Sequence, residues 1–254
     1  MPLTKALTDA GAHRTLWPAM STTRKRPLPR GTLDRERIVA ASLRLLDERG
    51  TRGFSMPALG RELGADPSAV YRHFASKDDL VLAITDELIA QQDIPSLRGS
   101  CWVETLILIA RHTWDLGAAR PAAMALTASR TAAMPATFAA ANHIVGTFRE
   151  AGFDPDDAAR MYRSFVDFML AAAQQRATLI DLGEGTLMLD ATNEAAFRSA
   201  DPAAYPHIAA AAETIATREW DDSFELSAAL MLRGIVSLAP NRCSGHEHSL
   251  PGLP

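Results

Sequence analysis

Cysteine is scarce in this chain, with only Cys101 and Cys243 among 254 residues. Two distant cysteines provide neither a disulfide framework nor metal ligands at a regular spacing. The chain also lacks any run of about 18 uncharged apolar residues, so we expect no transmembrane helix and no membrane partner. The N-terminus lacks the apolar segment of a signal peptide. These absences together favour a protein of the reducing cytoplasm.

Aromatic residues make up only 6% of the chain, and alternating runs of β-branched residues are missing. Such runs are the usual signal of half-buried strands. Hydrophobic residues nevertheless reach 47% of the chain, and many of them are alanine. Alanine has the highest helix propensity of all residues. The composition therefore predicts an all-α protein, with either two modest domains or one large one.

Charge is divided unevenly along the sequence. Residues 1–80 contain 14 Lys and Arg against 9 Asp and Glu, whereas residues 81–254 contain 12 against 21. A basic end suits a polyanion such as nucleic acid, and an acidic body suits another partner. A chance scatter of surface charge gives the same result, so the division alone favours nucleic acid only slightly.

Four helices are predicted within about sixty residues of the first third. Gly50 ends the first helix, and Gly64 turns the chain between the second and the third, which form a helix-turn-helix. The N-cap residues expected to start the last three helices are Ser55, Asp66 and Ser76. The four helices are expected over residues 34–49, 56–63, 67–74 and 77–92. The expected core is Leu43, Leu46, Phe54, Leu59, Leu63, Val70, Phe74 and Leu80.

The remainder of the chain is also predicted to be helical, with proline and glycine between the elements. Residues 181–206 have weak periodicity and predict a long loop of the kind that is usually functional or disordered. The helices are expected over residues 101–117, 121–132, 135–151, 155–181, 205–218 and 221–238.

The stretch "DRERIVAASLRLLDERGTRGFSMPALGRELGADPSAVYRHFASKDDLVLAI" resembles the N-terminal domain of the TetR family of transcriptional regulators. The likeness covers about residues 34–85 and implies that the helix holding Tyr71 is a recognition helix for the major groove. The landmarks that keep the family's order are Gly50, Phe54, Ser55, Leu59, Leu63, Gly64, Tyr71, His73, Phe74, Lys77 and Leu80.

The resemblance also implies individual DNA contacts. Hydroxyl, imidazole and ammonium groups suit phosphate oxygens, and the residues implied to contact phosphates are Ser55, Tyr71, His73 and Lys77. Those left to meet base edges are Pro67, Ser68, Ala69 and Arg72. Arg72 suits a guanine, and Ala69 suits a thymine methyl. By itself, His73 would better suit a polar helix end packed against the fourth helix, but within the whole set of landmarks a phosphate contact is favoured. The arm "RKRPLPR" is either a minor-groove ligand or a solvated leader.

The second half resembles the regulatory domain of the tetracycline repressors in "GFDPDDAARMYRSFVDFMLAAA", in the loop after it and in "FELSAALMLRGI". This likeness implies a homodimer, formed through helices 155–181 and 221–238, and a small effector. Tetracycline repressors bind a metal-chelated drug through histidines. The matching stretches "IAQQDIPSL" and "LGAARPAAM" contain none. We therefore expect an organic effector, with no metal and no other cofactor.

An effector pocket is expected among the large side chains of the middle helices, because ligand sites are mostly apolar with a few polar groups. The same residues at helical spacing are more often part of an ordinary core, and a histidine among them is more often a satisfied core residue. The pocket candidates are Trp102, His112, Trp114, Met124, Phe138, His143, Met161, Phe165, Phe168 and Met169.

The predicted function is an operator-binding transcriptional regulator, a repressor released by its effector. An enzyme on a helical scaffold and an interaction module without DNA binding are the alternatives. The sequence shows no glycine-rich phosphate loop and no catalytic constellation, so we expect no enzyme. The predicted parts are a disordered basic arm at 1–30 that starts at Met1 or Met20, a helix-turn-helix domain at 31–80, an effector-binding and dimerisation domain at 81–240, and a flexible tail at 241–254.

Overall fold

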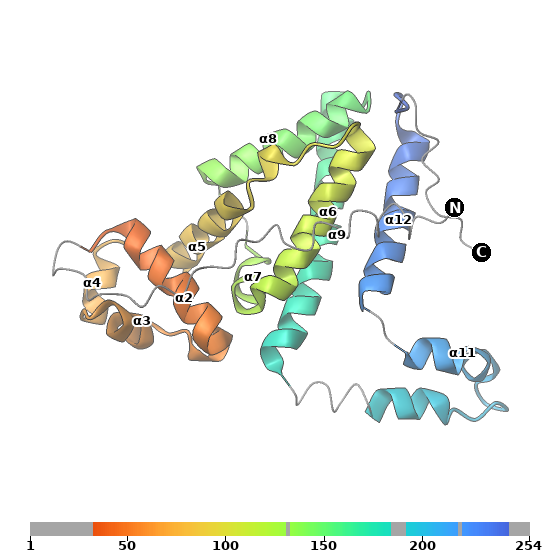
Figure 1. Cartoon of the computed structure of the whole chain (residues 1–254), viewed down its shortest axis with the longest axis horizontal. Coiled ribbons are helices and arrows are strands. Elements are labelled where there is room, and N and C mark those ends of the chain that lie inside the picture. Colours follow the sequence, from red (N-terminus) through yellow and green to blue (C-terminus); the bar gives the residue numbers. More distant parts are fainter. Residues whose placement is uncertain (1–32, 131–132, 184–191, 218–219, 244–254) are drawn as a thin grey trace.

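The computed structural model describes residues 33–130, 133–183, 192–217 and 220–243. The predicted arm at 1–30 lies outside these residues, as does the predicted tail beyond residue 243. Every regular element within the described ranges is a helix (Figure 1), which confirms the all-α prediction. None of the described helices is long and apolar enough to cross a membrane.

One long helix and two short ones form the N-terminal end of the described chain. Ser55 caps α3, where its hydroxyl accepts a hydrogen bond from the backbone N–H of Ala58 at 3.3 Å. Gly64 ends α3 with a positive φ of 63°, a conformation that glycine adopts without strain. The turn therefore lies where the sequence predicts it. The three helices are α2 (Arg35–Gly53), α3 (Met56–Leu63) and α4 (Pro67–Tyr71).

Helix α4 is shorter than the 67–74 helix predicted from the sequence, because it ends at Tyr71. Arg72 is its C-cap, and the backbone N–H of His73 still bonds the carbonyl of Val70 at 2.9 Å. The first helix is interrupted at Gly50, as predicted, where φ is 66°.

The first hydrophobic core joins these three helices to the helices behind them. Seven of the eight predicted core residues are buried in it, and only Leu63 is partly buried. The same cluster includes Met124 of α7 and Ala173 of α9. The helix-turn-helix thus shares its core with later parts of the chain instead of folding around a core of its own.

Helix α5 leads from this unit into the larger body (Figure 1). Helices α6, α8, α9 and α12 enclose a second core, in which the largest side chains are Trp102, Trp114, Phe148 and Phe165. Gly117 lets α6 approach α9 closely, because a Cβ there would lie 2.7 Å from the carbonyl oxygen of Ala173. The body elements are α5 (Lys77–Gln92), η2 (Ile94–Ser96), α6 (Trp102–Ala119), α7 (Pro121–Thr127), α8 (Pro135–Glu150), α9 (Pro155–Leu182) and α12 (Trp220–Leu238).

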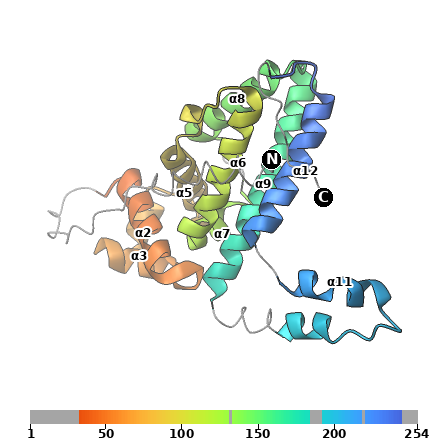
Figure 2. The same cartoon turned by 45° about the vertical axis from the view of Figure 1, so that its right-hand side comes forward.

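Between α9 and α12 the chain extends away from the body. Residues 192–198 are helical, and α11 (Pro206–Ala216) follows. Figures 1 and 2 both show these helices apart from the main bundle. The prediction of an unstructured loop over 181–206 is therefore wrong for residues 192–198. Their helix was missed because the seven residues "TNEAAFR" are too few to show an apolar periodicity.

Candidate functional site

Helix α4 lies at the end of the molecule opposite α12 (Figure 1). Its exposed side chains are polar. Asp66 caps it by accepting a 2.8 Å hydrogen bond from the backbone N–H of Ser68. The side-chain and backbone hydrogen bonds of Ser68, followed by the charge of Arg72, hold the pKa of Asp66 below its ordinary value. Tyr71 is 49% exposed and Arg72 is exposed beside it. The cap and the fixed φ of Pro67 hold this one-turn helix in place.

The other predicted contact residues lie around α4 with different exposures. Ser55, Ser68 and Lys77 are exposed, whereas Pro67 and His73 are half-buried. The Nζ of Lys77 lies 5.5 Å from the ring centre of Phe54, which leaves its charge at the surface. Ala69 is buried, with 8% of its surface exposed, so its methyl group offers little area to a base.

Arg35 is a cation at this end of the molecule that the sequence analysis missed. Its guanidinium lies 4.1 Å from the ring centre of Phe74 and donates to the carbonyl oxygen of His73. It also lies 3.7 Å from the carboxylate of Asp79. The basic and acidic residues of "DRER" were the sequence feature that could have indicated Arg35, and such a run is also typical of an ordinary helix start.

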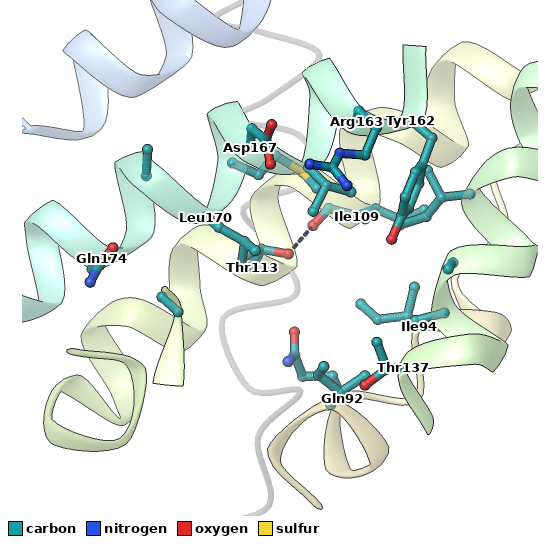
Figure 3. A pocket seen from close by; sticks show the side chains of 18 of the residues that line it. Gln92, Ile94, Ile109, Thr113, Thr137, Tyr162, Arg163, Asp167, Leu170 and Gln174 are labelled. Carbon is teal, nitrogen blue, oxygen red and sulfur yellow. Dashed lines mark hydrogen bonds between the residues drawn. The ribbon is translucent and has the colours of Figure 1, made fainter. Parts of the chain in front are cut away.

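A cavity of about 370 Å³ lies in the body, between α5, α6, α8, α9 and the segment that follows α7. Its walls are largely aliphatic, with Ile94, Ile109 and Leu170 among them (Figure 3). Its polar lining residues are Gln92, Thr113, Ser129, Arg130, Thr137, Tyr162, Arg163, Asp167 and Gln174. A mostly apolar cavity with a few polar groups is the usual form of a small-molecule site.

Several of these polar groups are fixed before any ligand arrives. The Nε2 of Gln92 donates to the carbonyl of Leu88 at 3.3 Å, which leaves its Oε1 as an acceptor; the residue is 9% exposed. The hydroxyl of Thr113 donates a hydrogen bond to the carbonyl oxygen of Ile109 at 2.9 Å (Figure 3). Burial raises the pKa of Tyr162, so its hydroxyl stays protonated and can donate. The site can thus offer both donors and acceptors to a ligand.

Few of the residues predicted for the effector pocket line this cavity. Of the ten candidates only Met169 lines it. Phe138 is 62% exposed on α8, and Met124 belongs to the first core. The candidates that lie in or against the second core instead are Trp102, Trp114, His143, Met161, Phe165 and Phe168. These large apolar groups fill space, whereas the cavity wall is made of smaller ones.

The two histidine candidates also lie outside the cavity lining. The ring Nε2 of His143 is 2.9 Å from the carbonyl oxygen of Leu97, as in a satisfied core histidine. The Nε2 of His112 is buried without a hydrogen-bond partner, and burial lowers the pKa of this residue. Within the described ranges, no group of three or more His, Cys, Asp and Glu side chains is placed to hold a metal ion.

Trp114 and Phe168 line a second, smaller cavity of about 290 Å³ between α6, α9 and α12. Trp114 stacks on Phe224 with ring centres 4.4 Å apart, and Phe168 stacks on the same ring at 6.4 Å. The guanidinium of Arg176 lies 4.5 Å above Trp114. This stack joins the three helices and has few polar groups with which to recognise a ligand.

Polar bridges connect the helix-turn-helix unit to the body. The Arg120 side chain, 6% exposed between α6 and α7, bonds both carboxylate oxygens of Asp47 at 3.1 and 2.7 Å and Gln91 at 2.7 Å. At the other end of α7, Arg130 bonds Asp78 at 3.0 Å. Helix α7 is therefore held to the N-terminal unit by one buried and one exposed ion pair.

Comparisons with known proteins match both parts of the chain. Residues 38–84 match the family described as bacterial regulatory proteins, tetR family. Residues 94–238 match the family described as tetracyclin repressor-like, C-terminal domain.

Curated relatives carry names of the same kind. An HTH-type transcriptional regulator of Saccharopolyspora erythraea is 29% identical over 154 residues, which are 60% of this chain and 64% of that protein. An HTH-type transcriptional repressor of Mycobacterium tuberculosis is 32% identical over 110 residues, 42% of each chain. The chain thus spans between two-fifths and two-thirds of the length of these relatives.

Solved structures share the arrangement of helices. A possible TetR family transcriptional regulator from Streptomyces coelicolor has a TM-score of 0.68 and 30% identity, covering 81% of this chain and 100% of that one. ActR from the same organism without ligand has a TM-score of 0.73 at 20% identity, covering 83% and 100%. ActR has also been solved in complex with actinorhodin. At 20% identity the likeness to ActR shows the fold alone.

Proposed function

Because the chain belongs to the tetR family of bacterial regulatory proteins, we propose that it is a DNA-binding transcriptional repressor, released from its operator by a small organic effector. The observation that carries the proposal is the surface of α4, a capped one-turn helix with Tyr71 and Arg72 exposed at the end of the molecule. A helix of five residues buries little and is marginal alone, so its presentation to a partner is its main use. The role is binding and release, not catalysis, and its place of action is the cytoplasm, where bacterial DNA lies.

The proposed DNA contacts follow from exposure and chemistry. Arg72 is exposed and has the forked donors that suit a guanine edge, with Pro67 and Ser68 beside it. Arg35 is proposed as an additional phosphate contact, because its guanidinium lies beside His73. The residues proposed to contact phosphates with it are Ser55, Tyr71, His73 and Lys77.

We propose a homodimer that uses α9 and α12. Leu226 and Leu230 lie one turn apart on α12, and each is 49% exposed. Ile180 and Leu182 are exposed near the end of α9. Exposed leucines at i and i+4 form a stripe that a second helix can cover. A two-fold dimer would present two copies of α4 to two related half-sites.

The proposed parts are a DNA-binding unit at 31–80 and an effector-binding and dimerisation unit at 81–240. Support for an effector comes from the cavity, whose size and mostly apolar walls suit an organic molecule. The complex of ActR with actinorhodin shows that this helical arrangement can hold an organic ligand. The proposal of a metal-free effector rests on the two stretches without histidine, "IAQQDIPSL" and "LGAARPAAM".

The test is footprinting of the full chain on DNA fragments from around its own gene, with light scattering of the complex. We expect protection of two related half-sites by a dimer, with affinity that falls as salt is raised. Arg160→Gln, a change on the exposed start of α9, is the control and should leave the footprint unchanged. Protection of one asymmetric half-site, a bound monomer, or no sequence preference at all would overturn the proposal.

A further inference from the structure

The charge of the cavity differs from that of the helices that enclose it. Residues 81–254 contain 21 acidic side chains against 12 basic ones. The lining of the cavity reverses this balance, because it contains Arg130 and Arg163 against Asp167 alone. The lining thus has one more cation than anion in an otherwise acidic part of the chain, and this local charge favours an anionic ligand.

The two arginines are not equivalent. Arg163 and Asp167 stand four residues apart on α9, and Figure 3 shows them side by side at one wall, so the carboxylate offsets that cation. Arg130 comes from the segment after α7, and its partner lies outside the cavity. Its Nη2 is 3.0 Å from the Oδ1 of Asp78, in the first turn of α5.

Arg130 can exchange its partner Asp78 for the anionic group of a ligand at little cost in free energy. The Asp78 side chain is largely exposed, so water screens the attraction and the pair contributes little to stability. A carboxylate held inside a partly apolar cavity is screened less than one at the surface, and a guanidinium binds it through two parallel hydrogen bonds. A ligand anion therefore competes with Asp78 on favourable terms.

We propose that the effector is an organic acid whose anionic group binds Arg130 and displaces Asp78. The inference rests on the proposed effector-released repressor and names its ligand class. Displacement leaves the charge of Asp78 uncompensated next to Lys77, a residue that we place near DNA phosphates. The uncovered anion then repels the DNA backbone, so the ligand-bound protein has the lower DNA affinity that release requires.

The test measures binding of two fluorescent probes to the full-length protein at constant ionic strength. The first is 8-anilinonaphthalene-1-sulfonate, an aromatic acid, and the second is Nile red, a neutral dye. Arg130→Gln should weaken binding of the sulfonate about tenfold or more and leave Nile red unchanged, because it removes the charge of the donor and keeps a polar side chain. Arg160→Gln, which removes an equal charge from the exposed part of α9, should change neither probe.

A second variant gives an effect of opposite sign. Asp78→Asn should strengthen binding of the sulfonate by about 1.5- to fivefold, because Arg130 is then free of its competitor. Adding Asp78→Asn to Arg130→Gln should bring no further gain. A purely structural role for the ion pair predicts instead that both single variants bind less.

The proposal is overturned if the wild type does not bind the sulfonate, or if Asp78→Asn weakens sulfonate binding. It is also overturned if Arg130→Gln leaves the affinity for the sulfonate unchanged or lowers the affinities for both probes equally. None of these measurements uses DNA. They can therefore fail while footprinting still shows a repressor, and the two proposals are tested separately.

Discussion

The surface around α4 and the cavity are built in different ways. Apart from Arg35 of α2, the residues of the first come from one stretch, 55–77, in which each helix has its own cap and turn. The residues of the second come from six parts of the chain between Ile89 and Gln174. Local signals therefore fix the first region, whereas packing between distant helices fixes the second. For that reason, sequence analysis predicts the caps and turns of the first region but few of the residues that line the second.

The largest effect should come from replacing an aromatic of the second core. Phe165→Ala removes a side chain that is 1% exposed and should lower the free energy of unfolding by about 3–5 kcal/mol. Phe138→Ala, at a residue that is 62% exposed, should change it by less than about 0.5 kcal/mol. Urea unfolding of both variants decides this. Equal losses would mean that exposure on α8 is a poor guide to packing.

The link between the two regions can be broken at α7. Asp47→Asn removes the negative charge that pairs with the buried guanidinium of Arg120, while the new amide oxygen still accepts one hydrogen bond and Gln91 stays in place. The change should cost about 1–3 kcal/mol of stability. Asp78→Asn, at the exposed pair with Arg130, is the matched control and should cost less than about 1 kcal/mol. Shifts in the urea midpoint of unfolding, with no change in the dependence of the free energy on urea concentration, would measure these losses of stability. A small loss at Asp47 would show that the two regions are only loosely joined.

Within the α4 surface, base and phosphate contacts should separate. Arg72→Ala should lose about 1–3 kcal/mol of discrimination at one base pair and little elsewhere. Binding to a set of operators with single substitutions measures this. If affinity falls equally for every operator, Arg72 contacts a phosphate and not a base.

Lys77→Ala should have a smaller effect, shared by all sequences. Loss of one phosphate contact reduces the slope of log affinity against log salt by about 1 and leaves sequence preference unaltered. Titrations at several salt concentrations measure the slope. Tyr71→Phe should weaken binding just as uniformly but keep the slope, because it removes a hydroxyl and no charge. A change of base preference in either variant would reverse these assignments.

The smallest effect is a pH dependence from His112 on α6. Burial lowers the pKa of this histidine, an effect that the charge of Asp115 only partly offsets. As the pH falls, His112 therefore binds a proton near pH 6.5 in the unfolded chain but not in the native protein. The free energy of unfolding should fall as the pH falls from 7 to 5. His112→Gln should flatten that decline, whereas His207→Gln, an exposed site, should not. Urea unfolding at several pH values tests this.

Much of the N-terminal unit could be predicted from the sequence. Ser55, Asp66 and Ser76 act as the caps that the pattern indicates, because each bond involves residues two or three apart. Ala69 shows the limit of such reasoning. The sequence pattern assigns Val70 as the inward residue of α4. The helix also buries a second residue, Ala69, against its neighbours, and spacing alone does not reveal which residue that is.

The lining of the cavity could not be predicted from the sequence, because a cavity forms where the side chains of several helices leave space unfilled. Aromatic residues were expected to line it, yet Trp102 and Phe165 are large enough to close the space around them. Tyr162, Arg163 and Gln92 line it instead, and on sequence alone each resembles an ordinary residue of a helix surface. Only the relative placement of α5, α8 and α9 distinguishes them.

The shared first core sets a limit on how recognition units can be exchanged between relatives. Met124 and Ala173 pack into the same cluster as the helix-turn-helix, so the back of α2 is shaped to fit α7 and α9. A chimeric regulator joined within α5 would bring a foreign α2 against this surface. Swaps of DNA specificity should therefore succeed when only the outward residues of α3 and α4 are grafted, and should fail to fold when the whole unit is replaced.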